Sequence, residues 1–391
     1  MAAAREVKAG GLGDQFPVDV FQAGGGTSVN MNLNEVITNR ALELLGHRRG
    51  EYDRLHPNDH VNMSQSSNDT FPTAAHVATV WYADDLLGEL DGTALSLRAK
   101  AEEFGDLVKV GRTHLRDALP VTLGGELAAY ATALERSGDR IRQRRSDLLA
   151  VPLGGTAVGT GANTPDGYRR LAVSLLSEEA SVPLRPSLDG MEGLQSRAQL
   201  GALSSSLREL CLEVVRIAGD LTLLSSGPVA GLGEISLPPV QPGSSIMAGK
   251  VNPSVPECVT MVCFHVLGLD AAVAWGVQAG QLELNAMVPL IAHDVLESEH
   301  ILVAAMGVLR ERCLDGITAH PERMSGPLER DPVLSTLLIP RIGYRRAAEV
   351  MKEASSSGWT VKETVVRRGF LSEEEVEELL AKHRHVPVMP R

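Results

Sequence analysis

A regular stripe of apolar residues is the clearest pattern in this chain of 391 residues. It repeats alternately every four and three residues. Its members are Leu203, Leu207, Leu210, Val214, Ile217, Leu221 and Leu224. This spacing places the side chains on one side of an α-helix, as in helices that pack lengthwise against one another. The stripe therefore predicts a long helix within a bundle.

Further amphipathic stretches have helical spacing and are separated by glycine, proline or short polar runs. We expect helices at residues 28–45, 73–104, 120–149, 256–282 and 289–309. Long helices joined by polar loops are typical of an elongated antiparallel bundle.

The pattern divides the chain into three parts. Residues 1–65 are irregular apart from one helix and form an N-terminal domain, and residues 66–315 hold the long helices. Residues 316–391 form a small C-terminal helical domain, in which Ser372 and Glu375 have the spacing of a capping box. We predict an all-α fold: an elongated central helical bundle with smaller flanking N- and C-terminal helical domains.

Composition supports helices and excludes some partners. Aromatic residues make up 4% of the chain, whereas strands favour aromatic and β-branched residues. The net charge is −12 and no dense basic patch is present, which argues against nucleic acid. The most apolar window, residues 259–277, is interrupted by His265 and Asp270 and indicates a core helix instead of a membrane span.

Residues 1–11 lack the apolar core of a signal peptide. The four cysteines form no CxxC pair and lie mostly among apolar residues, so we expect buried free thiols, as in a reducing compartment. These features predict a cytoplasmic protein.

Four polar loops carry hydroxyl and amide groups, one imidazole and one ammonium. Their candidate residues are Thr27; Ser66, Ser67 and Asn68; Thr113 and His114; and Ser244, Ser245, Lys250 and Asn252. Such donors at helix N-termini and in glycine-containing loops bind anions. His56 and His60 flank a proline-containing loop, so no metal site is expected. The loops favour a pocket without metal or cofactor for a small dicarboxylate.

Residues 243–253 form the most informative of these loops. Pro242, Gly249 and Pro253 prevent a regular helix. By composition alone, a surface linker is the alternative interpretation, because most loops are connections. Backbone N–H groups turned toward one point would instead depress the pKa of an acid placed there.

The motifs resemble those of the aspartase/fumarase superfamily. Its signature loop is similar to Gly243-Ser244-x-x-Met247-x-x-Lys250-x-Asn252, and the further motifs lie at residues 26–32, 56–59, 64–69, 111–117 and 155–163. They occur in the family's order over nearly the whole chain. The resemblance implies β-elimination that gives fumarate from a 2-substituted succinate. It also implies a homotetramer in which each site is built from three chains.

The resemblance assigns the proton transfer to the signature loop. Ser244 would be the ionised base that takes the Cβ proton, while Ser245, Lys250 and Asn252 would hold the carboxylate that becomes an aci-carboxylate. A serine base requires a very large depression of its pKa, for which Lys250 and the loop amides are the visible sources.

The same resemblance assigns the remaining candidates. Thr113 and His114 would hold the other carboxylate, and Glu257 would be the acidic neighbour of the histidine. The residues around the leaving group would be Thr27, Ser66, Ser67 and Asn68.

Two branches of the superfamily compete. Residues 14–23, 24–29, 224–228 and 279–285 resemble aspartase, whereas residues 66–72 and 342–349 resemble class II fumarase. We favour aspartate ammonia-lyase. A fumarate hydratase, or a lyase of another 2-substituted succinate, is the first alternative. An inactive structural or binding homologue is the second.

Four residues depart from the family pattern. Arg116 and Gly125 each stand where glutamine is usual, Val229 replaces arginine, and Ala248 replaces proline. The added guanidinium near His114 could bind a third anionic group or depress the imidazole pKa. Alanine at position 248 would loosen the loop. The family's usual N-terminal segment is also missing, which implies a truncated N-terminal domain.

Overall fold

The computed structural model describes residues 1–22 and 24–384. Ala23, at the end of the motif at residues 14–23, and residues 385–391 of the predicted C-terminal domain lie outside the described residues. The chain divides into two compact units. Unit 1 consists of Met1–Gly88, Ser137–Leu212 and Val262–Ala304, and unit 2 of Glu89–Arg136, Glu213–Met261 and Ala305–Arg391. The three-domain division at residues 65 and 315 stays a prediction.

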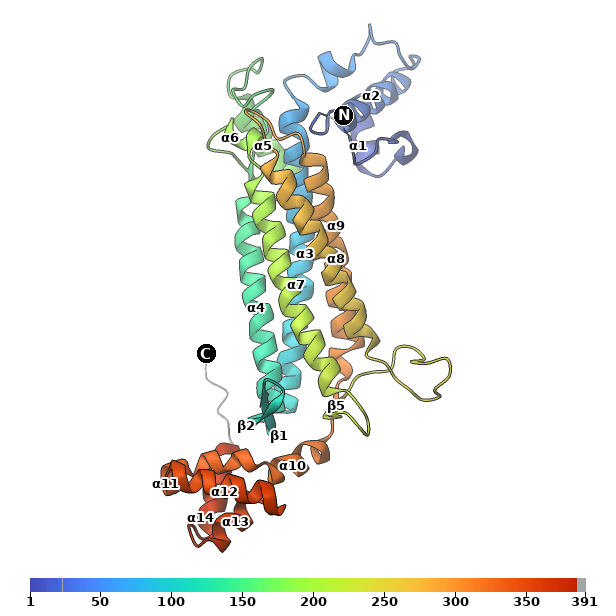
Figure 1. Cartoon of the computed structure of the whole chain (residues 1–391). Helices are drawn as coiled ribbons and strands as arrows, with labels where there is room; N and C mark the ends of the chain where they lie inside the picture. Colours follow the sequence, from blue (N-terminus) through green and yellow to red (C-terminus); the bar gives the residue numbers. More distant parts are fainter. Residues whose placement is uncertain (23, 385–391) are drawn as a thin grey trace. The chain divides into compact units, whose positions relative to one another are not determined.

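Stretches of five long helices run alongside one another within each unit (Figure 1). They are α3 (Ser67–Glu103), α4 (Leu123–Asp147), α7 (Ala198–Leu224), α8 (Ser254–Gln278) and α9 (Val288–Arg312). The other α-helices described are α1 (Ala2–Lys8), α2 (Thr27–Leu44), α5 (Tyr168–Ala180), α6 (Glu192–Gln195), α10 (Pro321–Arg330), α11 (Ile339–Ile342), α12 (Tyr344–Ser357), α13 (Val361–Arg367) and α14 (Glu373–Arg384). The all-α class and the central helical bundle are confirmed.

Short elements complete the described chain. Two-residue strands pair as β3 (Ala150–Val151) with β4 (Arg185–Pro186) and as β5 (Ile235–Ser236) with β6 (Thr318–Ala319). The remaining short helical segments are the 3-10 segments Gly13–Gln15, Leu314–Gly316 and Pro332–Leu338 and the π-helical turn Pro57–Val61.

The apolar stripe on α7 is buried as predicted. Six of its seven residues are at most 1% exposed, and Leu224 is 6% exposed. Burial of each leucine stabilises the fold by about 1.5–3 kcal/mol relative to an exposed position. The helix ends at Leu224 because the serine, glycine and proline at positions 226–228 cannot continue it.

Helix α3 begins at Ser67, ahead of the predicted start at residue 73. The Oγ of Ser66 accepts the N–H of Asn68 at 3.2 Å, and the N–H of Ser66 donates to Oδ1 of Asp69 at 3.0 Å. This reciprocal pair satisfies two backbone N–H groups at the start of the helix in the manner of a capping box. Pro72, which the sequence places before the helix, therefore lies inside it.

A β-hairpin replaces the polar loop and the helix start predicted at residues 111–120. Its antiparallel strands are β1 (Val108–Thr113) and β2 (Arg116–Thr122), and α4 follows from Leu123. Pro120 pairs with Val110 within the ladder. The prediction was wrong because Gly111 and Pro120 look like breakers in the sequence, whereas a two-stranded hairpin with an irregular register accommodates both.

The C-terminal helices α11–α14 group together in unit 2 (Figure 1) and enclose a core that includes Leu338, Val350 and Val365. The N–H of Ser372 donates to Glu375 Oε2 at 2.8 Å, and the N–H of Glu375 donates to Ser372 Oγ at 3.2 Å. The predicted capping box is therefore confirmed.

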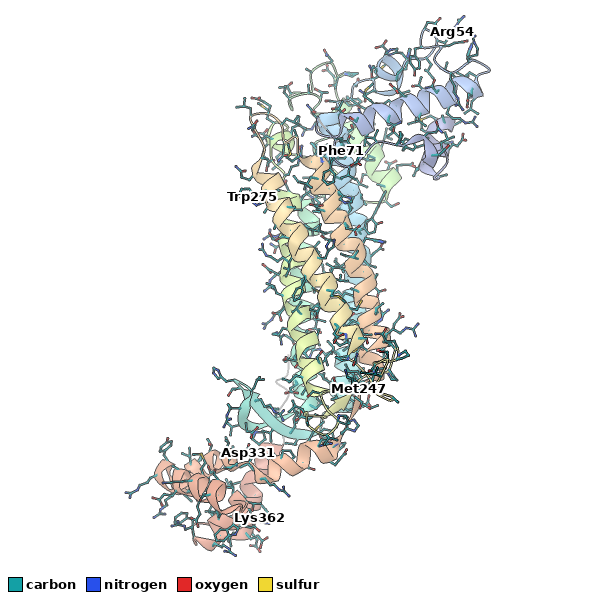
Figure 2. All side chains as sticks on the ribbon, turned by 45° about the vertical axis from the view of Figure 1, so that its right-hand side comes forward. Arg54, Phe71, Met247, Trp275, Asp331 and Lys362 are labelled. Atoms are coloured by element: carbon teal, nitrogen blue, oxygen red, sulfur yellow. The ribbon has the colours of Figure 1, made fainter. Side chains whose placement is uncertain are left out.

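Helix α8 is only partly buried in the single chain. By length and composition it is the one described helix that could cross a membrane, and 28% of its most apolar window is buried. Trp275, labelled in Figure 2, is 75% exposed. The sequence predicts a core helix here. One face of α8, which carries Val259, Cys263 and Val266, is buried in the chain, whereas the opposite face is exposed. All four cysteines are free, and Cys258 on this helix is exposed, which corrects the expectation of buried thiols at that position.

Candidate active site

In unit 1, the first turns of α2 and α3 carry four predicted site residues. Thr27 is exposed at the start of α2, and Ser66 caps α3. Ser67 is buried and Asn68 is half-buried in the first turn of α3. The Nδ2 group of Asn30 on α2 donates to Ser67 Oγ at 3.0 Å, which ties the two helix starts together. Free N–H groups at helix N-termini favour an anion.

A buried carboxylate, to which the sequence assigned no role, anchors the start of α3. The side chain of Asp69 is fully buried, and its Oδ2 accepts the N–H groups of Gly154 at 3.0 Å and Thr156 at 2.8 Å. Burial raises the pKa of Asp69, while hydrogen bonds from backbone N–H groups, first that of Ser66, oppose the rise. The available sequence signal was its capping-box position three residues after Ser66. Asp69 thus joins α3 to the glycine-rich loop at residues 154–161.

In unit 2, Thr113 and His114 are exposed at the tip of the hairpin. Thr113 pairs with Arg116, which leaves His114 and Leu115 as a two-residue turn with φ angles of 53° and 57°. Two positive φ angles are typical of a type I′ turn, whose twist matches that of the flanking strands. Positive φ is uncommon outside glycine. His114 is therefore held in a sparsely populated conformation at the hairpin tip.

Ser244 lies in a tight turn of the α7–α8 connection in unit 2. Its Oγ accepts two backbone N–H groups, the nearer from Met247 at 3.0 Å (Met247 is labelled in Figure 2). The Nδ2 of Asn252 donates to the carbonyl of Gly243 at 2.6 Å and closes the loop. A Cβ on Gly243 would lie 2.1 Å from the carbonyl oxygen of Lys250, so this closure requires glycine. N–H donors of this kind stabilise a negatively charged oxygen, which a serine base requires.

Three further predicted residues are exposed in or shortly after this loop. Ser245 and Lys250 belong to the loop, and Glu257 lies in the first turn of α8. Within residues 1–22 and 24–384, no ion pair or side-chain hydrogen bond engages the ammonium of Lys250, so this group can bind an anion. No such bond joins Glu257 to His114 in the same residues. The single chain therefore does not show the histidine–acid contact that the family resemblance implies.

The predicted residues fall into three local groups: the paired helix starts of unit 1, and the hairpin tip and the serine loop of unit 2. Within unit 2, no hydrogen bond or ion pair between described residues links the tip to the loop. The described residues also contain no group of three or more His, Cys, Asp or Glu side chains placed to hold a metal. Each group can bind an anionic portion of a ligand, and the serine loop can also stabilise an alkoxide.

Comparison with known families and sequences gives relatives of two different activities at the same identity of 46%. Residues 1–268 match the lyase family, and residues 334–384 match the fumarase C C-terminus. The chain is 46% identical over 380 residues to an aspartate ammonia-lyase of Pseudomonas aeruginosa, covering 97% of this chain and 80% of the relative. It is 46% identical over 374 residues to a class II fumarate hydratase of Chromobacterium violaceum, covering 95% and 81%.

Solved structures share the fold. A crystal structure titled fumarate lyase:delta crystallin, from Brucella melitensis and bound to cobalt, has a TM-score of 0.94 and 44% identity, covering 99% of this chain and 84% of that chain. A recombinant class II fumarase from Schistosoma mansoni has a TM-score of 0.94 and 33% identity, covering 100% and 85%.

Proposed function

This chain belongs to the aspartase/fumarase superfamily of lyases, and on that premise we propose that it eliminates ammonia from L-aspartate to give fumarate. A base removes a proton from Cβ, the electron pair forms the carbon–carbon double bond, and ammonia leaves from Cα. Before the leaving group departs, the carboxylate next to Cβ carries extra negative charge as an aci-carboxylate. Stabilising that charge is the main task of the site.

The observation that carries the proposal is the hydrogen bonding of Ser244. Two backbone N–H groups donate to its Oγ, and the ammonium of Lys250 in the same loop has no ion pair or side-chain hydrogen bond among the described residues. Both features favour the ionised form of an acid. Ser244 is therefore the proposed base, and Ser245, Lys250 and Asn252 are the proposed contacts of the aci-carboxylate.

The other predicted residues complete the substrate contacts in this proposal. Thr113 and His114, exposed at the hairpin tip, bind the second carboxylate of the substrate, and Glu257 lies beside His114 in the assembled enzyme. The proposed residues around the amino group are Thr27, Ser66, Ser67 and Asn68. The bond from Asn30 to Ser67 supports this last set, because it ties the starts of α2 and α3 together.

An exposed face of α8 supports a homotetramer with sites shared between subunits. Met261, Phe264 and Trp275 are 64%, 57% and 75% exposed. Gly268 and Ala271, which are also exposed, lie between them, so the spacing along the face is three, four, three and four. An apolar stripe with this period packs against other helices, and an exposed patch of this kind marks an interface. We propose that second copies of α8 cover it.

Fumarate hydratase is the second candidate. It is favoured by the match of residues 334–384 to the fumarase C C-terminus and by the class II fumarase relative at 46% identity. The same base and the same carboxylate contacts would catalyse this reaction, because it differs from the ammonia elimination only in its leaving group, which is water. The aspartase-like motifs at residues 24–29 and 279–285 favour ammonia over water.

The ultraviolet absorbance of fumarate separates these functions. Purified protein is mixed with L-aspartate and with L-malate in separate reactions. A rise with aspartate alone supports the ammonia-lyase, and a rise with malate alone identifies a hydratase. No rise with either, from an assembled tetramer, overturns both proposals and leaves another succinate derivative or an inactive homologue.

A further inference from the structure

Four charged side chains meet beside the β1–β2 hairpin, and the proposed mechanism uses none of them. Lys109 Nζ lies 2.6 Å from Glu234 Oε2 and 2.8 Å from Glu126 Oε2. Arg112 Nη2 lies 2.7 Å from Glu234 Oε1. The side chains of Lys109 and Glu234 are 1% and 2% exposed. Two cations and two carboxylates balance, as charges removed from water require.

The cluster spans an irregularity in the hairpin. The register shifts between Val110 and Arg112, where one residue of β1, Gly111, faces two of β2. Such a β-bulge bends the hairpin and increases its twist. A Cβ on Gly111 would lie 2.5 Å from a backbone carbonyl oxygen of β2, so the bulge requires glycine. Glu234 binds Lys109 before the bulge with one oxygen and Arg112 after it with the other.

Both the backbone N–H and the backbone carbonyl of Glu234 are hydrogen-bonded. Its N–H donates to the carbonyl of Leu224, the last residue of α7, at 2.9 Å, and its own carbonyl accepts the N–H of His320 at 2.9 Å. The carboxylate that bridges the bulge is therefore attached to the end of a long helix. Arg112, the outer end of the bridge, directly precedes Thr113 at the hairpin tip.

We propose that Glu234 is a positioning residue that fixes the bend of the hairpin and so places Thr113 and His114 for the substrate carboxylate. This inference rests on the proposed function of the tip. Glu126 provides a matched comparison, because it binds the same Lys109 but from α4 and makes no ion pair with Arg112. Loss of Glu126 removes one charge and leaves the bridge across the bulge intact.

The test compares Glu234→Gln with Glu126→Gln in the full-length protein. Hydrogen–deuterium exchange of the peptide at residues 108–122 reports the hairpin without any need for turnover. In Glu234→Gln we expect exchange at the tip to be about tenfold faster, and the KM for L-aspartate to rise about tenfold with little change in kcat, since the lost contact acts in ground and transition states alike. In Glu126→Gln, both should stay within about twofold of the wild type.

Equal effects of the two substitutions, or no change in exchange at the tip, would overturn the proposal. If Glu234→Gln does not fold, Arg112→Gln replaces it, because this substitution removes the outer half of the bridge and leaves the buried Lys109–Glu234 pair. The same increases in tip exchange and in KM are expected for this variant. Their absence would overturn the proposal. If the wild type makes no fumarate, the proposed function fails, while the exchange comparison still decides the role of Glu234.

Discussion

Asp69 accepts the backbone N–H of Thr156 at 2.8 Å, across 87 positions of sequence. The same oxygen accepts the N–H of Gly154 at 3.0 Å, and the neighbouring Asn68 donates through Nδ2 to the carbonyl of Ala157 at 2.8 Å. These three bonds hold the glycine-rich loop against the first turn of α3. A buried carboxylate thus fixes the geometry of the proposed leaving-group contacts.

Replacement of Asp69 by asparagine tests this anchor. An amide can offer only one oxygen to the three N–H groups around the carboxylate, so a buried donor loses its partner. We expect the free energy of unfolding to fall by about 1–3 kcal/mol. Fumarate release should also slow, because Asn68 shifts with the loop. Urea unfolding and the absorbance assay measure the two effects. Asp166→Asn, at an exposed position of unit 1, is the control, and equal stability of the two variants would refute the anchor.

Glu299 on α9 makes stability depend on pH. It is fully buried, and neither carboxylate oxygen has a hydrogen-bond partner in the described chain. Burial, followed by the negative charge of Asp84, raises its pKa well above the ordinary value of 4.5. The folded state therefore binds this proton more tightly than the unfolded state. The resulting stability is present below pH 4.5 and is lost as the pH rises through the raised pKa of the folded state.

Glu299→Gln removes this titration. We expect the variant to gain stability relative to the wild type as the pH increases above the ordinary glutamate pKa, because its side chain stays neutral at every pH. Urea unfolding over a series of pH values measures the difference. Glu297→Gln, two residues away and partly exposed, should follow the wild-type curve. Parallel curves for Glu299→Gln and the wild type would show that Glu299 does not titrate in this way.

The exposed stripe on α8 predicts that assembly depends on Trp275. A carboxylate at this position would be buried in the proposed interface without a partner. The free energy needed to remove it from water would then oppose assembly. We expect Trp275→Glu to shift the protein from tetramer to smaller species in light scattering and to reduce fumarate release at least about tenfold, since sites shared between subunits are lost. Leu171→Glu, at a 62% exposed position on α5, is the control. A fully active tetrameric Trp275→Glu would contradict the interface.

The sequence predicts α7 well and α8 incompletely for one physical reason. Both helices carry apolar residues at alternating spacings of three and four. This spacing predicts that one face of the helix packs against other helices, but it does not show whether those helices belong to the same chain. Leu207 and Leu210 are buried within the chain, whereas Phe264 and Trp275 are exposed in it. Periodicity alone cannot distinguish a contact within the chain from a contact between chains.

The pattern of apolar and polar residues could not predict the β1–β2 hairpin or the contacts of Asp69 that anchor α3. Gly111 and Pro120 are common breakers, and only the long-range pairing of β1 with β2 makes them strand residues. Motif resemblance selected Ser66, Ser67 and Asn68 directly. It did not reveal the role of Asp69, because the N–H groups that this carboxylate accepts include two from residues 154 and 156, far along the chain.

The central claim is that Ser244 is the base of an ammonia elimination, and the rate of fumarate release from L-aspartate tests it most directly. Ser244→Ala should release fumarate about 10²–10⁴-fold more slowly than the wild type, the usual contribution of a positioned base, while remaining tetrameric. Ser254→Ala, at the start of α8, should keep the wild-type rate. Unchanged turnover in Ser244→Ala would contradict the assignment and place the base elsewhere.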